Sequence, residues 1–166
     1  MIVKMKLSHE SIQKAIEQVN TYADSLEAKC AELCERLAKI GVQAAVRCIT
    51  QSTSGTGELA ASMQVEQSGD TSFLVITRNE HAAFVEFGTG VVGSGTYSGE
   101  LPQGWSYDQR RTPAAHDSAD PTRWWYYDKQ GRRRSTRGQK ATGFMAVAGE
   151  EMRQAVLDTA KEVFAT

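Results

Sequence analysis

The chain has 166 residues, with 19 Lys and Arg against 20 Asp and Glu, and a formal net charge of −1 at pH 7. This length suits one domain, spanning residues 1–166, that can bury a core without disulfides. The near-zero charge argues against a chain that binds polyanions over its whole surface. No apolar run approaches the ~20 residues of a membrane span, so no membrane contact is expected.

The first predicted element is a long amphipathic helix within residues 8–40. Its apolar residues recur in alternating steps of four and three, which is the pattern of a heptad seam. Ser8 is a candidate N-cap. Gly41 is a candidate end or bend, after which an apolar stripe continues to about Thr50. At about 1.5 Å per residue the helix within 8–40 is about 50 Å long, so it either follows the domain edge or reaches a second copy. The seam consists of Ile12, Ile16, Val19, Ala23, Leu26, Cys30, Leu33, Leu37 and Ile40.

Three cysteines, Cys30, Cys34 and Cys48, fall in this helical sequence. An odd count of cysteines within a helix is typical of reduced thiols in a cytosolic protein. Cys30 and Cys34 lie one turn apart, as metal ligands could, but no second Cys or His pair lies nearby at zinc spacing. We therefore expect no metal and no cofactor.

The remaining elements complete an α+β pattern. The helical region, residues 8–50, is followed by a polar linker, Gln51–Glu58. Two strands within 59–79 are predicted to form a hairpin through the turn Ser68-Gly69-Asp70. An apolar stripe of helical spacing predicts a last helix within 144–164. Residues 57–166 are thus expected to form an antiparallel sheet, a long Gly/Pro/aromatic loop, and a C-terminal helix packed on the sheet.

The long loop, residues 88–143, contains a predicted basic hairpin. Nine of the thirteen aromatic residues lie between Phe84 and Tyr127. Because disordered segments are poor in aromatic residues, this loop is expected to pack against something. The stretch RWWYYDKQGRRRSTRG predicts an aromatic strand, Trp124–Tyr127, a turn and a basic return strand. Residues 123–140 hold seven basic residues and one acidic residue, a net charge of +6.

Two interpretations of the basic hairpin stay open. It could contact DNA or another nucleic acid, by base stacking and by phosphate contacts. Alternatively, its aromatic face covers the sheet while its basic residues prevent edge-to-edge strand pairing, and this interpretation is preferred. The residues concerned are Trp124, Trp125, Arg132, Arg133, Arg134 and Arg137.

The stretch HAAFVEFGTGVVGSG, His81–Gly95, places a single acid, Glu86, among apolar residues. The glycines from Gly88 to Gly93 match G-x-G-x-x-G, but the sequence that follows cannot form the helix that a dinucleotide site needs. Glu86 could act as a general base with His81 near it, yet the sequence fixes no nucleophile or acid partner beside them. A structural role for Glu86 is therefore preferred to an enzymatic one.

A buried carboxylate is costly unless it is paired or hydrogen-bonded. We expect Glu86 to accept hydrogen bonds from backbone N–H groups of the Gly88–Gly95 turn, or to pair with an arginine. With Phe87, Gly88 and Thr89 it would form a structural latch that holds the root of the long loop or contacts a neighbouring subunit. If Gly88 adopts a positive φ angle, its replacement by Ala should destabilise the turn, whereas an extended Gly88 would mean that Gly90 or Gly93 makes the turn sharp.

These stretches resemble a known family of phage morphogenesis proteins. The motif Tyr/His-Ala-x-x-Val-Glu-Phe-Gly-Thr corresponds to His81–Thr89, and Gly-Gln-x-Ala-x-x-Phe-Met corresponds to Gly138–Met145. A Gly/Pro/Trp-rich insertion with LPQGWSYD lies between them. The chain is similar, from about Gly57 to its C-terminus, to the neck and tail-completion (head–tail joining) proteins of long-tailed bacteriophages, in the gene-product-ten-like group of lambdoid phages and prophages.

The resemblance implies a function without catalysis. Members of that family are structural, so it implies a virion protein that is assembled in the bacterial host cytoplasm and forms a ring at the junction of capsid and tail. Its partners would be further copies of itself and the phage connector, portal or tail proteins. The family often has Arg-Pro before the Phe of the second motif, where this chain has Thr142-Gly143, so the start of the last helix departs from the family pattern.

Overall fold

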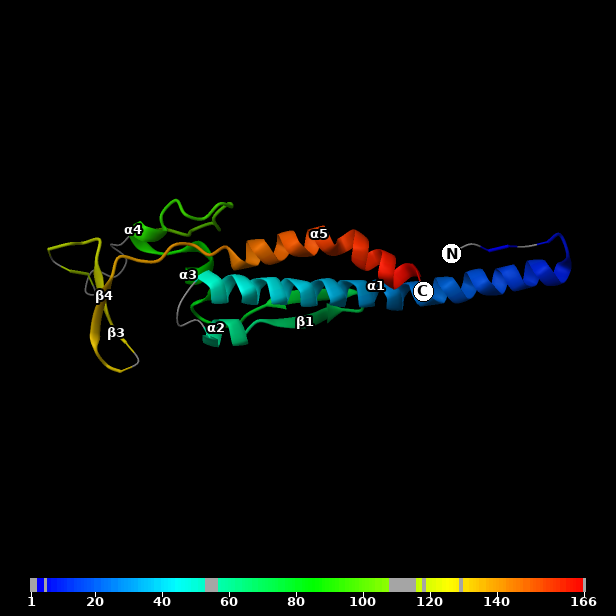
Figure 1. Ribbon diagram of the computed structural model, residues 1–166, viewed down its shortest axis with the longest axis horizontal. Helices are drawn as coiled ribbons and strands as arrows, with labels where there is room; N and C mark the ends of the chain where they lie inside the picture. Colours follow the sequence, from blue (N-terminus) through cyan, green and yellow to red (C-terminus); the bar gives the residue numbers. More distant parts are fainter. Residues whose placement is uncertain are drawn as a thin grey trace.

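The computed structural model describes residues 3–4, 6–52, 57–107, 116–117, 119–128 and 130–165. The predicted α+β class is confirmed (Figure 1). The elements in chain order are α1 (His9–Ser52), α2 (Gly57–Ala61), β1 (Gln64–Gly69), β2 (Ser72–Ile76), α3 (Ala82–Phe87), α4 (Gly90–Gly93), β3 (Trp124–Tyr127), β4 (Arg133–Thr136) and α5 (Phe144–Ala165).

The first helix is longer than predicted. It runs without interruption over 44 residues, about 66 Å at 1.5 Å per residue. The Ser8 hydroxyl accepts a hydrogen bond from the Ser11 amide at 3.3 Å, as expected of an N-cap. Gly41 neither ends nor bends this helix, so that expectation is wrong. It is buried, and a Cβ atom at Gly41 would lie 2.7 Å from Sδ of Met152 and 3.0 Å from Cγ2 of Val75. The glycine therefore allows α5 and β2 to approach α1 closely.

The strands form two separate two-stranded sheets, not one. Strands β1 and β2 make the predicted hairpin, with Val65 opposite Val75. Its first strand begins later than predicted, because Gly57–Ala61 forms a helical turn that buries Leu59. A short apolar run cannot be assigned to strand or helix by periodicity alone. Residues 53–56 of the predicted linker lie outside the described residues. Strands β3 and β4 form the predicted aromatic and basic hairpin, with Trp124 opposite Thr136.

The two long helices pack lengthwise in opposite directions. In Figure 1, α1 lies between α5 and the β1–β2 hairpin, so α1 supplies most of the surface that α5 covers. The predicted closing helix is confirmed as α5. It packs mainly on α1 and not on the sheet as predicted, because the β1–β2 hairpin lies on the other side of α1. Their shared core lies where the end of α1, α2, α3 and the start of α5 meet. Its buried members are Ala44, Ala45, Ile49, Leu59, Met63, Val85, Phe144 and Ala148.

Among the described residues, none of the helices is both long and apolar enough to cross a membrane.

Candidate functional site

Glu86 lies in the short helix α3, directly beside the core. Its side chain is buried, with 5% of the residue exposed, and its neighbour Val85 belongs to the core. Oε2 accepts a hydrogen bond from the Met145 amide at 2.8 Å, and Oε1 accepts one from the Ala146 amide at 3.3 Å. Both amides belong to the first turn of α5, whose orphan N–H groups and dipole favour a negative charge. Glu86 therefore caps a helix that begins 58 residues further along the chain.

This cap replaces one that the local sequence does not supply. The first helical bond of α5 runs from the Val147 amide to the Gly143 carbonyl at 2.9 Å, so Gly143 stands at the N-cap position. Glycine has no side chain that could accept the next amides. Gly143 also has φ +64°. Proline, with φ fixed near −65°, could not adopt this conformation, which accounts for Gly143 at a place where the family often has proline.

The partners of Glu86 differ from those predicted. We expected amides of the Gly88–Gly95 turn or an arginine, whereas the carboxylate binds amides of α5. It also accepts a bond from the Tyr97 hydroxyl at 3.3 Å. Burial raises the pKa of Tyr97, and the charge of Glu86 and their hydrogen bond raise it further. The side chain thus joins three segments: α3, the start of the insertion and the start of α5.

Of the two alternatives for Gly88, the structure has the positive φ angle, with φ +77° and ψ 171°. A Cβ atom there would lie 2.7 Å from the Ala141 nitrogen and 2.9 Å from the Gln139 oxygen. Gly138 is tighter still, since its Cβ would lie 1.8 Å from the Thr89 carbonyl oxygen. Glycine at these two positions lets the backbones of the two segments touch.

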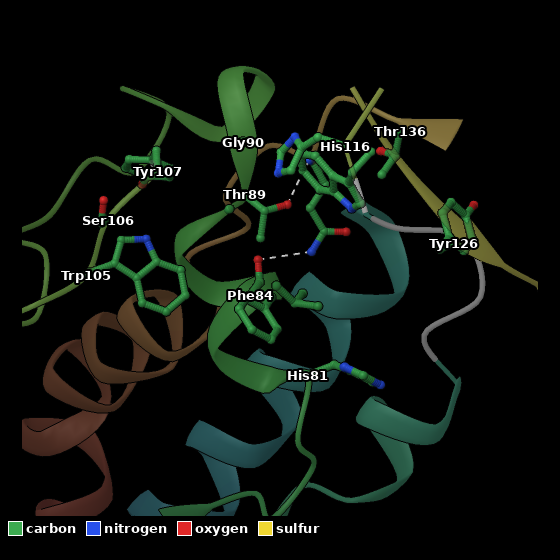
Figure 2. Close-up of a pocket in the computed structure, with 14 residues that line it drawn as sticks. His81, Phe84, Thr89, Gly90, Trp105, Ser106, Tyr107, His116, Tyr126 and Thr136 are labelled. Atoms are coloured by element: carbon green, nitrogen blue, oxygen red, sulfur yellow. Dashed lines mark hydrogen bonds between the residues drawn. The ribbon is translucent and has the colours of Figure 1, made fainter. Parts of the chain in front are cut away.

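Residues 84–90 and 138–146 together form one unit, which we call the junction. The Thr89 amide donates to the Gln139 carbonyl at 2.9 Å, and the Gln139 amide donates back to Thr89 at 3.2 Å. The Thr142 amide donates to the Val85 carbonyl at 3.0 Å. The Gln139 side-chain amide donates to the Phe84 carbonyl at 3.0 Å (Figure 2). The two sequence motifs are therefore halves of one structure.

Aromatic residues of the insertion pack against the junction, as their abundance predicts. The ring of Phe87 contacts the rings of Tyr97 and Trp105, each with centroids 5.0 Å apart. The Tyr107 hydroxyl donates to the Phe87 carbonyl at 2.7 Å. A pocket of about 680 Å³ opens beside them (Figure 2). Its lining includes His81, Phe84, Thr89, Gly90, Trp105, Tyr107, His116, Trp124, Tyr126 and Gln139.

The geometry gives no support to Glu86 as a general base. Glu86 is not among the residues that line the pocket, and its two oxygens already accept bonds from two amides and a hydroxyl. The glycine loop is followed by α4, a single turn of four residues, which is not the helix of a dinucleotide site. Within the described ranges, no group of three or more His, Cys, Asp or Glu side chains could hold a metal ion.

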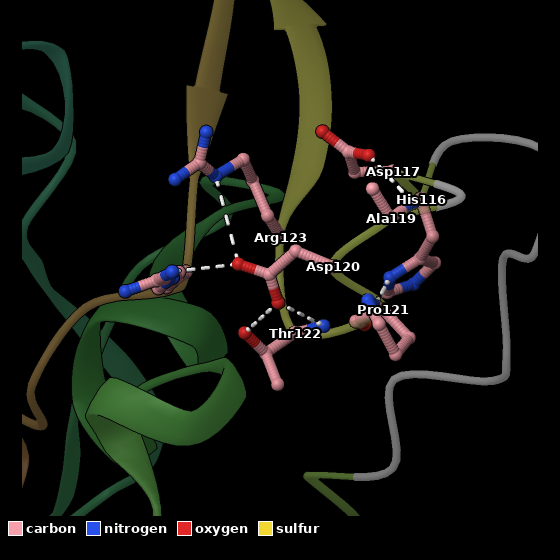
Figure 3. Close-up of polar contacts among 8 residues, drawn as sticks. His116, Asp117, Ala119, Asp120, Pro121, Thr122 and Arg123 are labelled. Carbon is pink, nitrogen blue, oxygen red and sulfur yellow. Dashed lines mark hydrogen bonds and ion pairs between the residues drawn. The ribbon is translucent and has the colours of Figure 1, made fainter.

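Carboxylates within the chain pair with most of the arginines of the basic hairpin. Asp128 accepts bonds from Nε of Arg132 at 2.9 Å and from Nε of Arg134 at 3.1 Å. Asp120 pairs with Nη2 of Arg137 at 2.6 Å (Figure 3). Hydrogen bonds from Thr122 and then from Arg137 lower the pKa of Asp120 to about 2. These guanidinium groups remain about half exposed but are not free charges.

The other hairpin residues singled out in the sequence are held by packing. The guanidinium of Arg133 stacks over the Trp125 ring at 4.2 Å. The ring of Trp124 lies 6.0 Å from that of His116 and lines the pocket. Asp120, Asp128 and Tyr97 were not predicted as partners. Only Asp128 carried a local signal, since an Asp that starts a turn ending in Gly commonly caps it.

A comparison with known protein families also points to a phage protein. The family model HK97-gp10-like, whose description is a candidate tail component of bacteriophage HK97, gp10, matches residues 13–88. Residues 13–88 are thus similar to the HK97-gp10-like family. The predicted resemblance to a phage neck and tail-completion family is confirmed. The matched range covers much of α1 and the first half of the junction, whereas the resemblance was predicted from about Gly57 onwards. No match was found among curated proteins or among solved structures.

The HK97-gp10-like family is a tail-related structural class of phage protein. The match ends at residue 88, inside the motif that runs from His81 to Thr89. Residues 89–165, with the insertion and α5, lie outside the matched range, so the roles assigned there rest on the geometry described above.

Proposed function

We propose that this chain is a non-enzymatic virion protein that joins or completes the tail at the head–tail interface of a long-tailed phage or prophage. It is assembled in the bacterial host cytoplasm and acts as a ring of identical subunits. The observation that carries the proposal is the HK97-gp10-like match over residues 13–88. The partners proposed are the connector or portal on one side and tail proteins on the other.

Two features of the molecule support an assembly role. The junction binds both ends of the insertion firmly, through Glu86, Gly88 and Thr89, while the β3–β4 hairpin extends beyond it (Figure 1). The hairpin exposes Tyr126 and Tyr127, 47% and 73% of each residue. Tyrosine supplies a large contact area at low entropic cost and is enriched at protein interfaces. We assign this hairpin to contact with another protein.

The alternative assignment, contact with DNA, finds less support in the charges. Arg132, Arg134 and Arg137 pair with Asp128 or Asp120, and Arg133 stacks on Trp125. A phosphate would have to compete with these contacts. If the hairpin nevertheless binds DNA, the affinity will fall steeply with salt. It will also be lost when the four arginines are replaced by Ala, which an electrophoretic mobility shift would detect.

Deletion of the gene in the phage or prophage tests the proposal. Loss of a protein that completes or joins the tail leaves filled heads and unjoined or incomplete tails, which electron microscopy of the lysate would show. Supplying the wild-type chain from a plasmid would restore joined particles. Normal joined particles in the deletion strain would refute the proposed function, whatever the oligomeric state of the purified chain.

A further inference from the structure

The N-terminal part of α1 projects from the body of the molecule. The last turns of α5 contact α1 near Arg36, whose guanidinium lies 3.4 Å from the carboxylate of Glu162. The N-terminal end of α1 continues past the end of α5 (Figure 1). We call residues 9–30 the N-terminal arm. At 1.5 Å per residue the arm is about 33 Å long.

The arm carries an apolar seam that the described residues leave uncovered. The large seam residues Ile12, Ile16, Val19 and Leu26 are exposed to 39%, 48%, 48% and 37%. Further along the same helix, Leu33, Leu37 and Ile40 are only partly exposed. Isolated exposed apolar residues are common in monomers, but a continuous stripe of them marks an interaction surface. The helix is amphipathic over its whole length, and the body covers this face only in its second half.

We propose that the arms of two copies of this chain pair as antiparallel helices through this seam. The spacing of the seam is self-complementary in one register. It places Ile12 opposite Cys30 of the second copy, Ile16 opposite Leu26, and Val19 opposite Ala23, and the symmetry repeats each layer. Two of the three kinds of layer combine a branched residue with a smaller one, which suits the filling of a helix–helix interface.

The body of the molecule favours the antiparallel direction. In a parallel pair, both bodies would lie at the same end. The partner helix would then have to leave the seam where Leu33 and Leu37 are partly covered within their own chain. In the antiparallel pair, the first seam residue of each arm, Ile12, lies opposite Cys30. This is about two turns before Arg36, where the contact with α5 begins. Each exposed seam is then as long as the arm that would cover it.

The residues that flank the seam do not oppose this pairing. In the antiparallel register Gln13 faces Glu27, and Ala15, which is buried within its own chain, lies on the side of Lys29, so no like charges meet. The Lys14 and Glu10 side chains pair with each other at 2.7 Å on the outer face of the arm. The charges beside the seam are therefore compatible with packing of a second copy against it.

This contact is distinct from the ring of the proposed function. An antiparallel helix pair is isologous and closes with two copies, whereas a ring requires a heterologous contact that repeats around an axis. Pairing of the arms would add a second self-contact to the proposed ring, and it can be tested on the purified chain alone. Its failure would leave the gene-deletion test of tail completion unaffected, and failure of that test would leave the pairing of the arms unaffected.

Cysteine crosslinking of the full chain tests the register, because Cys30 already lies in the seam. All three cysteines are free thiols. With Cys34→Ser and Cys48→Ser, Cys30 is the single thiol, and the antiparallel pair holds the two Cys30 residues about 27 Å apart. Mild oxidation should then give monomer on a non-reducing gel. Addition of Ile12→Cys should give a covalent dimer, because the new thiol faces Cys30 of the second copy.

Lys14→Cys in place of Ile12→Cys is the matched control, since Lys14 lies on the outer face with 67% of its side chain exposed. It should give no more dimer than Cys30 alone. Val19→Asp places a charge at the centre of the seam and should abolish the dimer formed by Ile12→Cys. Val19 is half exposed, so the melting temperature of the chain should stay unchanged. Equal dimer yields for Ile12→Cys and Lys14→Cys, or dimerisation through Cys30 alone, would overturn the antiparallel register.

Discussion

Replacement of Glu86 by Gln tests the most specific contact in the structure. The substitution keeps the size of the side chain but turns one oxygen into an NH₂ group. That group cannot accept a hydrogen bond from the amide of Met145 or Ala146, which now bind the carboxylate at 2.8 and 3.3 Å. One amide at the start of α5 would lose its acceptor, and the other would lose the assistance of a negative charge.

The expected cost follows from these contacts. Hydrogen bonds to a charged group contribute about 1.5–3 kcal/mol each, and a charge near a helix terminus contributes up to about 2 kcal/mol when it is partly buried. The glutamine retains one acceptor, so we expect the free energy of unfolding to fall by about 2 kcal/mol. For a chain of this size that lowers the melting temperature by about 4–8 °C. Hydrogen exchange should quicken first at the amides of Met145 and Ala146.

Glu150→Gln is a matched control on the same helix. The Glu150 side chain is 52% exposed and pairs with Arg153 on the surface, and exposed pairs contribute about 0–1 kcal/mol. In Glu86→Gln, the pKa of Tyr97 should also move back toward its ordinary value of about 10, because the charge and hydrogen bond of Glu86 raise it. Equal melting temperatures for the two variants, with unchanged exchange at Met145, would refute the capping argument.

Three further predictions concern backbone packing and pH. Gly88→Ala should lower the free energy of unfolding by at least about 2 kcal/mol, because φ is +77° and the Cβ meets backbone. Gly95 has φ +73° but no atom within 4 Å of its Cβ position, so Gly95→Ala should lower the free energy of unfolding by only about 1 kcal/mol. Equal losses for the two variants in urea denaturation would contradict the close backbone contact at Gly88. Gly149→Ala should stabilise α5 by about 0.5–1 kcal/mol. Gly41→Ala should bring a smaller gain, because the side chains of Met152 and Val75 would have to shift away from its Cβ, and an equal gain would be evidence against that close approach. The pKa of Asp120 is lowered to about 2. The stability that its ionised carboxylate gives the folded chain is therefore complete above about pH 4 and is lost as the pH falls through about 2. Titration of its carboxyl carbon by NMR should show this, whereas a midpoint near 4 would contradict the pairing with Arg137.

The helices could be predicted from the sequence because their signals are local. An apolar residue every three or four positions identifies both α1 and α5, and the side chain of Ser8 marks the start of α1. The role of Gly41 could not be predicted. Whether a glycine ends a helix or lets another element approach depends on its spatial neighbours, and here the decisive neighbour is Met152, far along the chain.

The candidate site shows the same division between local and distant causes. Burial and hydrogen bonding of Glu86 follow from one acid among apolar residues, since an unpaired buried charge is unfavourable. The partners of Glu86 could not be predicted from the sequence, because backbone amides such as those of Met145 and Ala146 have no sequence signature. The glycine-dense stretch predicted a turn after Glu86, but it left open whether Gly88 itself has the positive φ that the structure shows. Asp120 and Arg137 lie 17 residues apart within the long loop, where no periodicity relates one residue to another.

The position of the chain in the assembled particle tests the central claim most directly. Cryo-electron microscopy of joined particles from the phage or prophage that encodes it would resolve the head–tail interface. The account predicts a ring of identical subunits between connector and tail, each fitted by the antiparallel α1–α5 pair and the two hairpins. Joined particles whose interface contains no such subunits, with the chain absent from the purified virion, would contradict it.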